Sequence, residues 1–91
     1  MRPRTERQIA DLRNRIQQRL DARCRDIGFH LKVSAIVRRA ENQEHWLFFV
    51  VVPDTDGVRA YDYAMALADV ELELRRNEGE ENMLLVPAMP G

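Results

Sequence analysis

The chain has 91 residues, which suffices for one domain with a single core and leaves no room for two. Its 45% hydrophobic and 32% charged residues are typical of a soluble globular domain and exclude disordered or collagen-like chains. The net charge of -1 hides an asymmetry, since residues 1–39 carry 11 basic and 4 acidic side chains whereas residues 40–91 carry 3 and 11, and we expect the two halves to neutralise each other within the fold or across a dimer.

A helix is predicted over 6–27. Thr5 and Gln8 match a capping box, in which the hydroxyl accepts from a free first-turn amide and the glutamine reaches back. Gly28 supplies a left-handed stop after the helix. Between these signals, apolar residues recur at three- and four-residue steps and form one buried stripe: Ile9, Leu12, Ile16, Leu20, Cys24 and Ile27.

Two strands follow the helix. Along residues 29–38 the odd-numbered positions are apolar and most of the even-numbered ones are polar. This period of two predicts a strand whose odd-numbered residues, from Phe29 to Val37, are buried. A polar connection over 40–44 leads to a second strand over 46–52, which is apolar on both parities. We therefore expect the second strand to be covered on both faces.

A second helix is predicted over 58–76, with Thr55 or Asp56 as its N-cap and Gly79 just beyond its end. Its many apolar positions indicate that most of its circumference is buried. A short strand over 83–86 ends the pattern, and residues 1–4 and 87–91 are expected to be frayed tails.

These elements predict a single α+β domain over 1–91 with the order α-β-β-α-β. It contains a three-stranded mixed sheet with both helices on one face. The third strand runs parallel to the second, because the second helix is the crossover between them. We favour a strand order with the third strand beside the first, with the order 1-2-3 as the alternative.

One face of the sheet is left without a covering layer in this fold, which indicates an association surface. We therefore predict a homodimer, and a small interaction or regulatory domain that binds a protein partner. The expected interface contains Trp46 and Phe48 if the even-numbered residues of the second strand face outward. It contains the odd-numbered residues of that strand if they face outward instead. Its full set of candidates is Ile36, Trp46, Leu47, Phe49, Val51, Tyr61, Met65 and Leu72.

A metal-dependent enzyme is an alternative, because Asp54, Asp56 and Asp62 follow a buried strand. The spacing fails for a calcium loop, since Val52 and Tyr63 stand where further carboxylates are needed. Proline, aspartate and glycine also serve as ordinary turn punctuation. We find no catalytic signature, expect no cofactor and keep Asp54 and Asp56 only as weak metal candidates.

Nucleic-acid binding, RNA in particular, is the other alternative, and it depends on arginines of the first helix: Arg7, Arg15, Arg19 and Arg25. On a helical wheel these arginines do not share one face, and Asp11 and Asp21 lie at ion-pair spacing from three of them. A solvated helix that docks a partner is therefore the favoured interpretation.

Three further residues carry chemistry that we interpret as structural. His30 and His45 start their two strands, so an antiparallel hairpin places them at opposite ends. Cys24 lies on the apolar stripe as a buried thiol, and alone it closes no intrachain disulfide. Because the chain also begins without a secretory signal and its longest apolar run is short for a membrane span, we expect a cytoplasmic protein that does not enter the membrane.

Overall fold

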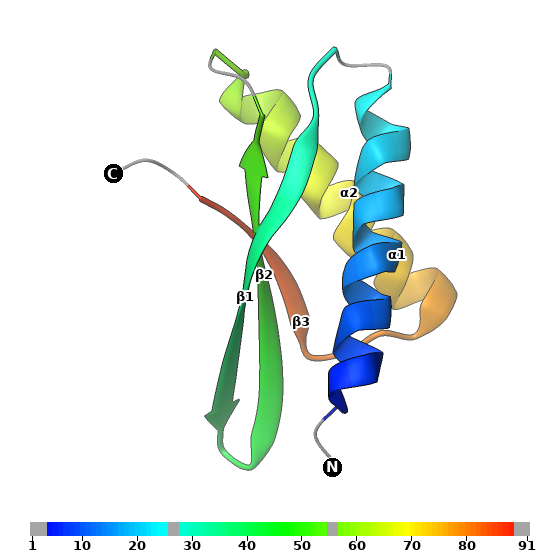
Figure 1. Ribbon diagram of the computed structural model, residues 1–91, viewed down its shortest axis with the longest axis vertical. Helices are drawn as coiled ribbons and strands as arrows, with labels where there is room; N and C mark the ends of the chain where they lie inside the picture. Colours follow the sequence, from blue (N-terminus) through cyan, green and yellow to red (C-terminus); the bar gives the residue numbers. More distant parts are fainter. Residues whose placement is uncertain (1–3, 26–27, 55–56, 89–91) are drawn as a thin grey trace.

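A computed structural model describes residues 4–25, 28–54 and 57–88 and confirms the α+β fold (Figure 1). Its elements are α1 (Glu6–Cys24), β1 (Leu31–Glu41), β2 (Glu44–Pro53), α2 (Ala60–Glu78) and β3 (Met83–Pro87). Neither of the two helices has the length and apolarity that crossing a membrane requires.

Helix α1 begins at the predicted capping box. Thr5 Oγ1 accepts from the Gln8 N–H at 3.1 Å, and Gln8 Oε1 accepts from the Thr5 N–H at 2.9 Å. The helix ends at Cys24, earlier than predicted, and Ile27 lies outside the described residues. Its buried side chains are those of the predicted stripe: Ile9, Leu12, Ile16, Leu20 and Cys24.

The strand order is β1-β2-β3, so the favoured order with the third strand beside the first is wrong. β2 pairs antiparallel with β1 and parallel with β3. The physical reason lies in β2 itself. A strand that is apolar on both parities loses most by standing at an edge, and in this order it has a neighbour on each side.

Both helices cover the same face of the sheet (Figure 1). The odd-numbered residues Leu47, Phe49 and Val51 of β2 point toward the helices and are buried. They join residues from all five elements in one core, including Leu12, Val70 and Met83. The even-numbered side chains of β2 point to the opposite side of the sheet, where no helix lies.

A β-bulge interrupts β1 between Val33, which pairs with Val51, and Ala35, which pairs with Val50. The extra residue, Ser34, reverses the side of the sheet to which later β1 residues point. Ile36 therefore packs against the core, although its parity predicted the uncovered face. Val37 goes the other way, from a predicted buried position to 45% exposure.

The two hairpin residues between β1 and β2, Asn42 and Gln43, both have positive φ, as a two-residue turn with the twist of its strands requires. Helix α2 starts at Ala60, later than predicted, and its N-cap Arg59 makes no side-chain cap hydrogen bond. The predicted caps Thr55 and Asp56 lie outside the described residues. At its other end Gly79 adopts φ 65° as predicted, and the helix ends at Glu78, two residues beyond the predicted end at Arg76.

The two chain ends are tied to the fold at the residues nearest their described limits. Arg4 lies 3.2 Å from the Glu80 carboxylate. The Ala88 N–H donates to Val51 O and to the Tyr63 hydroxyl, each at 3.2 Å. Residues 1–3 and 89–91, which belong to the predicted tails, lie outside the described residues.

Candidate protein interface

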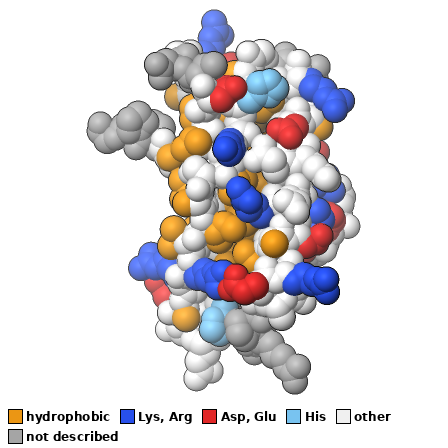
Figure 2. Space-filling view, in the orientation of Figure 1, with side chains coloured by type: hydrophobic (Ala, Val, Ile, Leu, Met, Phe, Trp, Pro, Cys, Tyr) orange, Lys and Arg blue, Asp and Glu red, His pale blue; other side chains and the backbone are white. Residues whose placement is uncertain are grey.

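The side of the sheet that faces away from the helices is built from rows of apolar side chains. We call it the open face. Register places Val37, Phe48 and Leu84 in one row across the three strands, and Ala35, Val50 and Val86 in the next. Trp46 and Val52 extend it along β2. Figure 2 shows hydrophobic side chains gathered along the flank that the strands form.

The side chains of the open face are only partly covered within one chain. Trp46, Phe48, Val50 and Val52 of β2 are half-buried, as are Leu84 and Val86 of β3. The rings of Trp46 and Phe48 stack at 6.5 Å between centroids and 25° between planes. Monomers seldom expose a contiguous apolar surface of this kind without a function.

Charged residues lie at the two ends of the open face and differ in sign. At the hairpin end, Glu41 pairs across the strands with Glu44, and Arg39 lies 3.4 Å from Glu41. Glu44 also accepts a hydrogen bond from Trp46 Nε1 at 3.3 Å. At the far end, Lys32 pairs with Val52. The hairpin end of the face therefore carries two carboxylates and one guanidinium, the middle is apolar, and the far end carries Lys32.

Among the predicted interface residues, Trp46 lies on the open face together with its same-parity alternative Phe48. Leu47, Phe49 and Val51 are core residues under the helices, with exposures of 5%, 0% and 0%, so the opposite parity is unavailable to a partner. Tyr61, Met65 and Leu72 are exposed on the solvent side of α2, well away from the sheet's open face. The sequence did not predict Val37 as an interface residue, because the regular alternation of apolar and polar residues over 29–38 gives no sign of the bulge.

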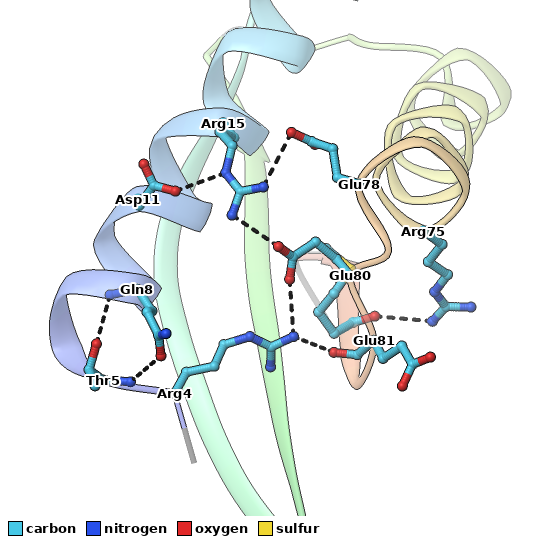
Figure 3. A network of polar contacts seen from close by, with 10 residues as sticks. Arg4, Thr5, Gln8, Asp11, Arg15, Arg75, Glu78, Glu80 and Glu81 are labelled. Carbon is cyan, nitrogen blue, oxygen red and sulfur yellow. Dashed lines mark hydrogen bonds and ion pairs between the residues drawn. The ribbon is translucent and has the colours of Figure 1, made fainter. Parts of the chain in front are cut away.

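Arginines of α1 form ion pairs with acidic residues of α2 and of the loop after it, and Figure 3 shows those of Arg15. Arg15 lies 3.2 Å from Glu78 and 3.0 Å from Glu80, and Arg19 lies 3.2 Å from both Glu73 and Glu78. Burial alone would lower the pKa of Arg15, but hydrogen bonds from its guanidinium to Glu80 and Glu78 outweigh that effect and raise it.

Basic residues of the N-terminal half therefore form ion pairs with acidic residues of the C-terminal half, as we expected. Arg23 pairs with Asp69 in the same way, and Arg38 of β1 pairs with Glu6 of α1. Of the four arginines considered for nucleic acid, only Arg7 and Arg25 form no ion pair with a described residue. They do not form a basic surface by themselves.

Asp54 acts as a structural turn residue. Its Oδ1 accepts from the His30 N–H at 3.1 Å, while its own N–H donates to His30 O at 3.0 Å. Asp56 lies outside the described residues, and the parts of the chain that are described hold no group of three potential metal ligands. His45 pairs with Ala40 near the hairpin, so the two histidines lie at opposite ends of the strands.

Cys24 is buried at the end of α1, and burial raises the pKa of its thiol. A thiol in this state has little thiolate at neutral pH and packs as a small apolar group. Tyr63 is the other buried group with a polar atom. Its hydroxyl donates to Val51 O and accepts from the Ala88 N–H, which ties α2 to the ends of β2 and β3.

Comparisons with protein-family models, with curated proteins and with solved structures found no match to this chain. The open face of the described sheet is the surface on which we base a function.

Proposed function

We propose that this chain is a small interaction domain that forms a homodimer by packing the open face of one sheet against the open face of another. The observation that supports it is the pair of apolar rows around Phe48 and Val50, which one chain leaves only partly covered. Covering a large apolar side chain completely contributes about 1.5–3 kcal/mol, and a facing sheet at about 10 Å supplies the missing layer.

A second copy suits this face because the face is complementary to itself. A two-fold axis that crosses the strands at the middle of the face lays the hairpin end of each copy over the far end of the other. Lys32 of each copy then approaches the Glu41 and Glu44 carboxylates of its partner, while the apolar rows meet in the centre. Both the charges and the apolar side chains find partners in the same arrangement.

The size of the open face sets the expected strength of the dimer. Three strands about 4.8 Å apart and seven residues of about 3.3 Å give an apolar area of roughly 14 by 23 Å. Counting both copies and the charged ends, the buried surface falls at the low end of specific interfaces, below about 1,200 Å². We therefore expect a dissociation constant in the micromolar range, with rapid exchange between monomer and dimer.

Sedimentation velocity over a range of protein concentrations tests this proposal. The native chain should change from one to two chain masses as concentration rises, and Phe48→Glu should remain monomeric because it places a charge in the central row. Tyr61→Glu is the matched control, since it changes an exposed aromatic residue on α2. A native chain that stays monomeric at every concentration, or a dimer lost in Tyr61→Glu and kept in Phe48→Glu, contradicts the proposal.

The emission of Trp46, the single tryptophan of the chain, provides a second readout on the open face itself. Dimerisation should shift its emission to shorter wavelength as water leaves the indole. We place this association in the cytoplasm because the lone buried thiol, Cys24, suits a reducing compartment.

A further inference from the structure

The sheet has two outer edges, and helix side chains occupy most of the described β3 edge but only the first half of the β1 edge. On β3, Arg75 donates to Met83 O at 3.0 Å, and Glu71 Oε1 accepts from the Leu85 N–H at 2.9 Å. Pro87 follows on the same edge and has no N–H to offer. These contacts leave little of β3 available to an added strand.

The two halves of the β1 edge differ in whether their outward backbone groups form hydrogen bonds. Backbone groups of odd-numbered β2 residues point toward β3, since the Leu47 N–H donates to Asn82 O and Val51 O accepts from the Ala88 N–H. The β1 residues opposite them, which are Leu31, Val33, Ile36, Arg38 and Ala40, must therefore point their own N–H and C=O groups away from β2.

Gln17 of α1 occupies the first half of this edge. Its side-chain amide donates to Leu31 O at 2.9 Å, and its Oε1 accepts from the Val33 N–H at 3.0 Å. The amide thus takes the place of a neighbouring strand. Beyond the bulge, no described residue forms a hydrogen bond to the outward groups of Ile36, Arg38 and Ala40, and this half of β1 diverges from α1 (Figure 1).

We propose that this free half-edge of β1, Ile36 to Ala40, is a strand-addition site for an extended, acidic segment of a partner protein. An added strand would pair with the three outward N–H and C=O groups. Arg38 and Arg39 flank the site on opposite faces of the sheet, with side chains 54% and 61% exposed. Arg38 already pairs with Glu6 and Arg39 with Glu41, but both guanidinium groups keep exposed area on which a carboxylate of a partner strand can make a further contact, one on either face.

A second copy of this chain is a poorer occupant of the half-edge. Two copies could pair their β1 edges antiparallel, with the outward N–H and C=O groups of each facing those of the other. The residue that then lies opposite itself is Val37, Arg38 or Arg39. The last two place arginines directly opposite each other, which is destabilising, so only the register centred on Val37 remains open to a second copy. This inference concerns an edge and not the open face, so it does not depend on the proposed dimer.

Amide hydrogen exchange followed by NMR tests the inference, and the Phe48→Glu variant keeps the protein monomeric. The probe is a nine-residue peptide of alternating threonine and valine in which three threonines are replaced by glutamate. At about 90% occupancy it should slow exchange of the Ile36, Arg38 and Ala40 amides about tenfold, because exchange then occurs only from the free protein. The same peptide with lysines in place of the glutamates should leave the rates unchanged.

Two variants at one position separate the backbone from the charge. Arg38→Ala removes the side chain and should weaken binding, whereas Arg38→Pro also removes the outward N–H and should abolish it. Proline is tolerated there because that N–H makes no bond to β2. The inference is overturned by unchanged exchange with the acidic peptide, by equal protection from the lysine peptide, or by binding that survives in a folded Arg38→Pro. Protection that rises with protein concentration alone would assign the edge to a second copy instead.

Discussion

Phe48 and Phe49 are adjacent in sequence and lie on opposite sides of the sheet, so truncating each in turn tests which side is the core. Phe49 is fully buried between Ile36 of β1 and Leu85 of β3. Phe48 is half-buried on the open face and stacks on Trp46. The two alanine variants remove the same atoms, which makes each the control for the other.

Phe49→Ala should lower the free energy of unfolding by about 3–5 kcal/mol, the usual range for a fully buried phenylalanine. A domain of this size has roughly 5–14 kcal/mol in total, so the loss is severe, and Phe49→Leu should give a smaller loss in the same direction. Phe48→Ala should cost less in the monomer, about 1–2 kcal/mol, because part of its ring still contacts water.

Urea unfolding at low micromolar concentration, where the dimer is dissociated, measures both values. At a slope of about 1–1.5 kcal/mol/M the Phe49→Ala midpoint should fall by roughly 2–5 M, and that of Phe48→Ala by roughly 0.7–2 M. At high protein concentration the deficit of Phe48→Ala should grow, since the native dimer then adds its binding energy. Equal losses for the two variants at low concentration would refute the assignment of the two faces.

Three further predictions concern the polar contacts. Gln17→Ala should lower the free energy of unfolding by about 1–3 kcal/mol in urea melts and increase aggregation, because it uncovers the Leu31 and Val33 edge; an unchanged melt would contradict this. Burial raises the pKa of Tyr63, so the contribution of Tyr63 to the free energy of unfolding should be complete below the ordinary pKa of about 10 and be lost at higher pH. In Tyr63→Phe, the free energy of unfolding should therefore fall less as the pH rises above about 10. The hydrogen bond and charge of Arg38 lower the pKa of Glu6, so its stabilising effect is present above the ordinary pKa and is lost as pH falls; in a carboxyl NMR titration, Arg38→Ala should raise that pKa, and an unmoved value would contradict the pairing.

The fold was predictable from the sequence wherever a local signal and the global pattern agreed. The Thr5 and Gln8 capping box and Gly79 set two helix ends, the start of α1 and the end of α2, without any tertiary information. The mixed sheet followed from the element order. The strand order required one further step, namely that the doubly apolar β2 prefers the centre, and the choice made without it was wrong.

The residues of the open face were less predictable, because a one-residue bulge determines which side chains of the second half of β1 lie on it. The alternation over 29–38 is regular, yet the bulge at Ser34 sends Ile36 to the core and Val37 to the open face. Which parity of β2 faces outward also depends on the side where the helices pack. Likewise, the sequence predicted that arginines and acids would neutralise each other but did not say that Arg15 would meet Glu78 and Glu80.

The central claim, that two copies meet through their open faces, is tested most directly by contacts between chains. In a mixture of ¹³C-labelled and unlabelled protein at high concentration, isotope-filtered NOEs detect only methyl contacts that cross from one chain to the other. The account predicts such contacts at the methyls of Val37, Val50, Leu84 and Val86. Contacts at Met65 and Leu72 instead, or none in a sample that sediments as a dimer, would contradict it.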